Sequence, residues 1–171
     1  MLIAQHLALT DILDSLLSLV FAFTFGTAIG VERQLRQRTA GLRTNALVAL
    51  AAAAFVDLGL HLQGPQGANY ISGYIVSGVG FLGAGAIMKE GANIMGLNTA
   101  ATLWGSAAVG AMCGADLWVQ AGLVTFFVLA ANTLLRYLVL YINTRPTSTD
   151  DTEANYHLYV VCERATLAQT L

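Results

Sequence analysis

A long stretch almost without charge is the feature that most constrains how this chain can fold. Residues 44–135 number 92 and contain four charged side chains, Asp57, Lys89, Glu90 and Asp116. Over the whole chain 11% of residues are charged, whereas an ordinary soluble domain carries about 25%. The stretch therefore predicts a membrane protein. The net charge of −2 argues against a nucleic-acid-binding protein, which needs a broad basic face.

Five segments are long and apolar enough to cross a bilayer. A hydrocarbon core about 30 Å thick needs roughly 17 to 25 mostly apolar residues, because a helix pairs every backbone amide within its own segment. The segments that meet this length are residues 15–31, 44–62, 71–88, 94–113 and 117–142, and polar or glycine-rich connections separate them. We predict an all-α membrane protein with five transmembrane helices, formed by residues 1–145.

The positive charges indicate how the chain is oriented in the membrane. All eight Lys and Arg residues fall on one side of the five predicted helices. They are Arg33, Arg36, Arg38 and Arg43 after the first helix, Lys89 after the third, and Arg136, Arg145 and Arg164 at or beyond the end of the fifth. Because Lys and Arg remain on the cytoplasmic side, we expect the N-terminus outside and the C-terminus inside.

Residues 146–171 differ in composition from the rest of the chain. Pro, Ser, Thr and acidic residues follow the fifth helix, and YHLYVVCE at 156–163 has the β-branched and aromatic pattern of one strand. A single strand is not stable alone. We therefore expect a short cytoplasmic linker and the start of a truncated module, disordered beyond about Arg145.

Small residues recur at helical spacing in the apolar segments. Such residues allow helix backbones to approach closely in lipid. We predict packing faces, within the monomer or between copies, at Gly26, Gly30, Gly80, Gly83, Gly85, Ser106 and Gly110. The GVGFLG segment at 78–83 has the spelling of a dinucleotide site, but it lies in an uncharged span and Leu103 stands where an acidic residue is needed. We expect no cofactor.

Three segments resemble one known family. They are GTAIGVERQLRQRTAGLRTNALVAL at 26–50, VSGVGFLGAGAIMKEG at 76–91 and GLNTAATLWGSAAVG at 96–110. In order and spacing these blocks are similar to those of the MgtC/SapB family of bacterial inner-membrane proteins. The resemblance covers roughly residues 15–142.

This resemblance implies a multi-pass protein of the bacterial inner membrane. It also implies a role in growth under magnesium limitation and in virulence, through survival inside host cells. Members of the family are regarded as modulators of other membrane proteins, the F-type ATP synthase in particular. Long members carry an ACT-like cytoplasmic domain, of which this chain has at most the first strand.

Polar residues near the cytoplasmic ends of the predicted helices are the candidate functional site. They are Glu32, Arg33, Arg43, Thr44, Asn45, Asn98 and Thr99. One hypothesis is that they form a polar pocket with the inner loop, which could receive an anion or a partner. The alternative is an ordinary interfacial cluster, in which Glu32 pairs with Arg36 and the amides and hydroxyls bond neighbouring helices.

Asp57 and His61 lie four residues apart on one face of the second predicted helix. An acidic side chain in a membrane helix is a candidate ion or proton site, because burying its charge is costly. Asp57 is only a weak candidate metal ligand, since no single layer collects several carboxylates. The alternative is an interfacial pair near the outer surface. His6, His61 and His157 cannot converge, so we expect no metal site and no enzyme activity.

Two functions remain open from the sequence. The first is a non-enzymatic regulator that contacts other inner-membrane proteins through its small-residue faces and its arginine-rich loop, as a homodimer or a hetero-complex in the lipid bilayer. The alternative is a small transporter of magnesium or another ion that uses Asp57 and the glycine-rich third helix.

Overall fold

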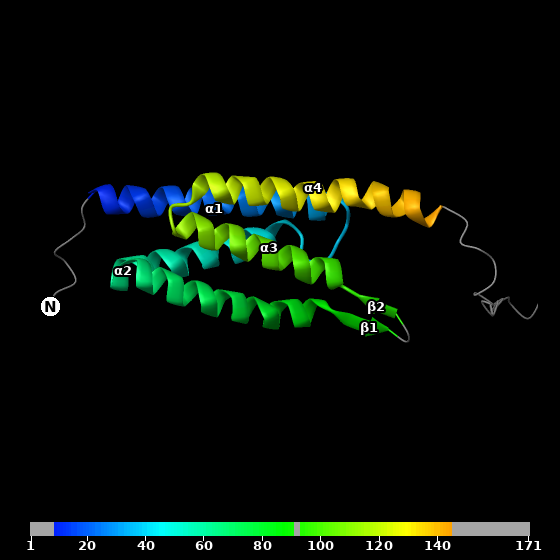
Figure 1. Cartoon of the computed structure of the whole chain (residues 1–171), viewed down its shortest axis with the longest axis horizontal. Helices are drawn as coiled ribbons and strands as arrows, with labels where there is room; N and C mark the ends of the chain where they lie inside the picture. The colour runs from blue at the N-terminus through cyan, green and yellow to red at the C-terminus, as the bar shows by residue number, and fades with distance from the viewer. Residues whose placement is uncertain (1–8, 91–92, 145–171) are drawn as a thin grey trace, which may run out of the picture. The chain divides into compact units, whose positions relative to one another are not determined.

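The chain folds mainly into helices. The computed structural model describes residues 9–90 and 93–144, of which 87% are helical. The elements in order are α1 (Leu9–Leu35), α2 (Leu42–Ala86), β1 (Met88–Glu90), β2 (Asn93–Met95), α3 (Leu97–Gly114) and α4 (Trp118–Asn143), as Figure 1 shows. In this part of the chain α1, α2 and α4 are long and apolar enough to cross a membrane. The prediction of a helical chain with membrane-type helices is confirmed.

Helix α2 consists of two helices that fold back on each other at Gly64. This residue has φ 63° and ψ −153°, which breaks the helix, and Pro65 then begins the second half. The two halves, residues 42–63 and 65–86, are each about 33 Å long at 1.5 Å per residue. They pack closely, since a Cβ added to Gly59 would lie 2.8 Å from the carbonyl oxygen of Gly67. The sequence predicts a connection of several residues between the spans that end at 62 and begin at 71, whereas in the structure the helix is interrupted at Gly64.

Helix α1, the first half of α2 and α3 pack together through small residues. A Cβ added to Gly26 would lie 2.7 Å from Cβ of Ala49, and one added to Gly110 would lie 2.7 Å from its Cα. The side chains of the buried core around this contact are Ala22, Ile29, Ala53, Val109, Cys113 and Ala121. The small residues therefore let three helix backbones meet in one place.

A short hairpin joins α2 to α3. Strands β1 and β2 are antiparallel, with Met88 opposite Met95 and Lys89 opposite Ile94. The predicted span at 94–113 is therefore wrong at its start, because α3 begins only at Leu97. Gly96 precedes α3 with φ 93°, and a Cβ there would meet the backbone of Ala86.

Helix α4 is the least buried helix. Its buried side chains are Ala121 and Thr125, and its start is held by Trp118, which stacks on Phe21 of α1 with ring centroids 5.4 Å apart. Residues from Leu138 onward form a separate unit, of which 138–144 are described. The strand predicted at 156–163 and the disorder predicted beyond Arg145 lie outside the described residues.

Candidate functional site

Arg33 is a buried cation at the end of α1. The residue is 2% exposed, and its Nη2 donates a hydrogen bond of 2.6 Å to Oγ1 of Thr99 and one of 3.4 Å to the carbonyl oxygen of Thr39. The hydroxyls of Thr39 and Thr99 are 3.1 Å apart. Arg33 therefore links α1, the loop at 36–41 and the first turn of α3. We call Arg33, Thr39 and Thr99 the arginine cluster.

Asn45 forms a second buried link close to the same loop. Its Nδ2 donates to the carbonyl oxygens of Ala40 at 2.6 Å and Gly41 at 2.9 Å, and its Oδ1 accepts a 2.8 Å bond from the hydroxyl of Ser106. The residue is 0% exposed. Both amide hydrogens and the amide oxygen are therefore satisfied, as a buried amide requires. The link holds the loop to α2 and α2 to α3.

Asn98 lies in a third network, which faces α4. Its Nδ2 donates to Oδ1 of Asn132 at 3.3 Å, and Nδ2 of Asn132 donates to Oγ1 of Thr102 at 3.4 Å. The hydroxyl of Thr102 donates back to the carbonyl oxygen of Asn98 at 2.8 Å. The structure thus separates two neighbours in sequence, because Thr99 bonds Thr39 of the loop at 36–41 while Asn98 bonds α4.

Glu32 near the end of α1 pairs with Arg36, the first residue after the helix, which confirms the ion pair expected from their spacing. The Glu32 side chain is 10% exposed. Apart from this ion pair, its two carboxylate oxygens are buried without a hydrogen-bond partner among the described residues, as is Nε of Arg33. Incomplete hydrogen bonding of a buried charge is costly, so the C-terminal end of α1 has polar atoms that could still accept or donate hydrogen bonds.

Arg43 and Thr44 lie outside these networks and are exposed at the start of α2. With Gln34, Gly41 and Leu42 they line an open cavity of about 580 Å³. The predicted site residues therefore occupy one end of the helices but form separate groups. Those groups are the arginine cluster, the Glu32–Arg36 pair, the Asn45 link, the Asn98 network and the exposed Arg43 surface.

Thr39 and Asn132 are residues of these networks that the sequence analysis did not select. Thr39 lies in a loop where a hydroxyl has no distinctive pattern. Asn132 had a usable signal, since it is an amide in the apolar segment 117–142, and such groups in membrane helices usually bond a neighbouring helix. Only the packing of α4 against α3 shows which helix that is.

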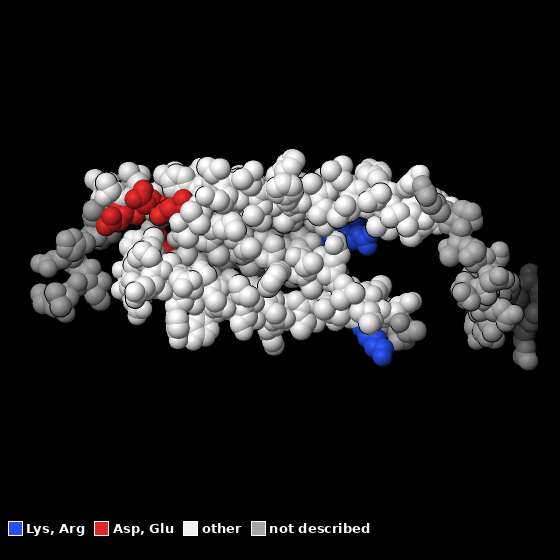
Figure 2. Space-filling view, in the orientation of Figure 1, with Lys and Arg blue, Asp and Glu red and all other residues white. Residues whose placement is uncertain are grey.

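Asp57 and His61 lie at the opposite end of the bundle, at the end where Figure 2 shows the acidic side chains. Oδ1 of Asp57 is 3.3 Å from Nδ1 of His61, and both line an open cleft of about 410 Å³ with Ser15 and Leu19. Nearby, the hydroxyl of Ser18 donates to Asp116 at 3.1 Å. Within residues 9–90 and 93–144, no three His, Cys, Asp or Glu side chains are placed to hold a metal ion.

The glycine-rich segments lie in two kinds of surroundings. Gly26, Gly30 and Gly110 are in close contact with neighbouring helices. A Cβ added to Gly83 would lie 3.4 Å from the Cβ of Ala100, which is an ordinary van der Waals contact. Gly80 and Gly85 have open space, with no described heavy atom within 4 Å of an added Cβ. Residues 78–83 are helical, which is not the strand-to-helix turn that a dinucleotide site needs.

Comparison with known proteins identifies relatives over most of the chain. Residues 19–140 match the MgtC family. The chain is 50% identical over 149 residues to protein MgtC of Salmonella typhi and 48% identical over 148 residues to protein MgtC of Brucella abortus, covering 87% and 86% of this chain. It is 49% identical to an uncharacterized protein of Synechocystis over 87% of the chain. The chain spans 62% to 64% of the length of these relatives. No solved structure matches it.

Proposed function

The chain belongs to the MgtC family, and from this premise we propose that it is a non-enzymatic regulator of other membrane proteins in the bacterial inner membrane. Its role is in growth under magnesium limitation and in virulence through survival inside host cells. The F-type ATP synthase is the partner that the family resemblance implies. The chain crosses the membrane five times, with the N-terminus outside and the C-terminus in the cytoplasm.

Two observations support the five crossings. The two halves of α2 are antiparallel helices, each long enough to span a hydrocarbon core of about 30 Å. Helix α3 has 18 residues, or about 27 Å, and lies between the longer helices. Acidic side chains gather near the start of α1, while the basic ones lie toward the hairpin (Figure 2). This separation agrees with the rule that Lys and Arg remain inside.

The single observation that carries the regulatory proposal is the buried Arg33. Its bonds to Thr99 and Thr39 hold the inner loop against the helices. Because the loop is already ordered, a partner that binds it does not pay the entropy cost of ordering it. The exposed Arg38 and Arg43 belong to this loop and the first turn after it. Arginines on a preorganised surface are suited to bidentate contacts with carboxylates of another protein.

Partner capture tests this proposal. The full chain would be produced in a bacterium that lacks its own family member, crosslinked in native membranes at low magnesium, and purified. We expect the double variant Arg38→Gln/Arg43→Gln to co-purify without ATP synthase and to slow the growth of the bacterium at low magnesium. The matched control is Arg136→Gln, an exposed arginine of α4. Equal capture and growth with both variants would refute a role for the loop.

Ion transport is the second candidate, and the cleft lined by Asp57 and His61 favours it. Liposomes loaded with a magnesium or proton indicator separate the two functions. Flux that Asp57→Asn abolishes would support transport. If the chain is a regulator, we expect liposomes with the purified protein to leak no faster than empty liposomes.

A further inference from the structure

Arg43 lies at about half the depth of the membrane in the proposed arrangement. The outer end of α3 is level with Ala53 of α2, because a Cβ added to Gly114 would meet the carbonyl oxygen of Ala53. Arg43 comes ten residues before Ala53, which places it about 15 Å further toward the cytoplasm at 1.5 Å per residue. This distance is half of a hydrocarbon core of about 30 Å.

A second contact supports this depth. Asn45, two residues after Arg43, accepts a hydrogen bond from Ser106. Ser106 comes eight residues before Gly114, so it lies about 12 Å from the outer end of α3. Even a fully extended arginine side chain covers at most about half of the distance that remains to the cytoplasmic boundary. The guanidinium of Arg43 is therefore inside the hydrocarbon core.

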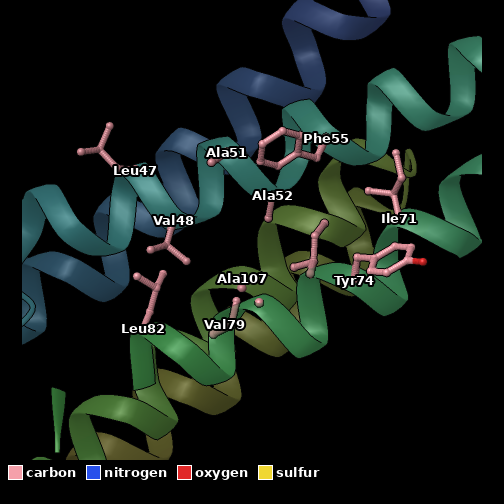
Figure 3. Close-up of a pocket in the computed structure, with 12 residues that line it drawn as sticks. Leu47, Val48, Ala51, Ala52, Phe55, Ile71, Tyr74, Val79, Leu82 and Ala107 are labelled. Atoms are coloured by element: carbon pink, nitrogen blue, oxygen red, sulfur yellow. The ribbon is translucent and has the colours of Figure 1, made fainter. Parts of the chain in front are cut away.

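Exposed apolar side chains surround Arg43 on α2. Leu42 is 36% exposed, and Leu47, one turn further along, is 62% exposed. Leu47 also borders a groove between the two halves of α2, which Figure 3 shows lined by apolar side chains such as Phe55 and Leu82. Lipid acyl chains are sufficient to fill that groove. They cannot satisfy a guanidinium, because a charge inside a membrane is costly without a partner.

Arg43 differs from the two arginines of α1 and its end in having no partner of its own. Arg33 is buried with hydrogen bonds to two threonines, and Arg36 pairs with Glu32. The exposed side chain of Arg43 forms no hydrogen bond or ion pair with any residue of 9–90 or 93–144. The open cavity of about 580 Å³ beside it leaves room for a group from another molecule.

We propose that Arg43 binds a carboxylate that a partner protein carries inside the membrane, on a transmembrane helix. The inference rests on the proposed function and adds the chemistry of the contact. The N–H groups of a guanidinium match the two oxygens of a carboxylate. An acidic side chain in a membrane helix is also costly without a cation, so the pair satisfies both molecules. Because Leu42 and Leu47 flank the arginine, the partner segment is apolar on both sides of its acidic residue.

An anionic lipid headgroup is the competing occupant. The phosphate of an inner-leaflet lipid lies outside the hydrocarbon core, and thus at least about 15 Å from the level of Arg43. The arginine side chain does not cover that distance, so the lipid would have to be drawn into the core. A carboxylate halfway along a membrane helix needs no such displacement. A partner helix is therefore favoured over lipid.

Association with model transmembrane peptides tests the proposal. The full chain with a fluorescent donor would be reconstituted in phosphatidylcholine liposomes, and energy transfer measured to acceptor-labelled helices of about 20 leucine and alanine residues. We expect a peptide with one aspartate at its centre to bind at least about tenfold more tightly than the same peptide with asparagine, as for a buried charge pair. Arg43→Gln should remove this difference. The variant should fold, because the Arg43 side chain is exposed and makes no bond to the rest of the described chain.

The matched control is Arg136→Gln. This exposed arginine of α4 comes 18 residues after Trp118, or about 27 Å, which is close to the cytoplasmic boundary. We expect the control to keep the preference for aspartate within about twofold of the unmodified chain, far less than loss of a buried charge pair costs. A peptide with its aspartate two turns from the centre should bind more weakly than the peptide with a central aspartate.

Fluorescence quenching measures the depth directly. A dye would be attached through Thr44→Cys or, as the control, through Leu35→Cys, in a chain that carries Cys162→Ser and in which Cys113 is buried. Leu35 is 80% exposed and comes 17 residues, or about 26 Å, after Ser18 at the outer end of the bundle. We expect lipids brominated in the middle of the acyl chain to quench the dye at position 44, and headgroup quenchers to quench the dye at position 35.

Three results would overturn the inference. They are equal binding of the aspartate and asparagine peptides, or a preference for aspartate that Arg43→Gln retains; a dye at position 44 that is quenched at the same shallow depth as the dye at position 35; and loss of the preference when phosphatidylglycerol is added, which assigns Arg43 to a lipid headgroup. Partner capture with Arg38→Gln/Arg43→Gln reports on the proposed function separately. Capture that this variant loses would leave the regulator standing even where the peptide and depth tests fail.

Discussion

Replacement of Asn45 by alanine should destabilise the folded chain more than replacement of any exposed amide. Asn45 is fully buried and takes part in three hydrogen bonds, to Ala40, Gly41 and Ser106. A neutral hydrogen bond contributes about 0.5–1.5 kcal/mol, and those inside membrane proteins lie toward the lower part of this range. With the small cavity left behind, we expect the free energy of unfolding to fall by about 2–4 kcal/mol.

Unfolding of the purified protein in mixed detergent micelles, followed by circular dichroism, measures this change. The matched control is Asn98→Ala, which removes an exposed amide with one bond of 3.3 Å and should cost less than about 1 kcal/mol. A double-mutant cycle with Ser106→Ala isolates the 2.8 Å bond, for which we expect a coupling of about 0.5–1 kcal/mol. Equal destabilisation by Asn45→Ala and Asn98→Ala would refute the reasoning.

Three further predictions concern the backbone contacts and the arginine cluster. Gly110→Leu should abolish folding, since a Cβ there already overlaps the backbone of Ala49, and the yield of monodisperse protein in detergent is the readout. Gly64→Ala should lower stability by about 1–3 kcal/mol, because φ 63° with ψ −153° is a backbone conformation that essentially only glycine adopts and the site is otherwise open; an unchanged stability would contradict this reason. Arg33→Met should release the loop from Thr99, so that a cysteine placed at position 40 reacts faster with a water-soluble maleimide, whereas an unchanged rate would show that the loop is held by other contacts.

The helices were predictable because hydropathy is a local property. The first half of α2 occupies residues 42–63 against a predicted span of 44–62. The hairpin at Met88–Met95 was missed because Met88, Ile94 and Met95 are as apolar as the helices that flank them. Hydropathy measures transfer into lipid, and it cannot separate a short strand from a helix end.

The candidate site was predictable as a set of residues but not as a set of pairs. Polar side chains at helix ends in an apolar chain stand out, which is how Arg33, Asn45 and Thr99 were selected. Which atoms meet depends on the rotation of each helix about its axis. One residue along α3 changes the direction of a side chain by about 100°, so Thr99 bonds Arg33 while Asn98 bonds Asn132.

The order of charged and apolar residues determines by itself that lipid suits this chain, because the cost of transferring each side chain out of water adds along the sequence. Tertiary structure alone decides that Gly110 lies against Ala49 while Gly80 faces open space. Both glycines stand in similar apolar surroundings along the chain. The difference arises only when the helices pack together, because which helices become neighbours depends on every contact along their length.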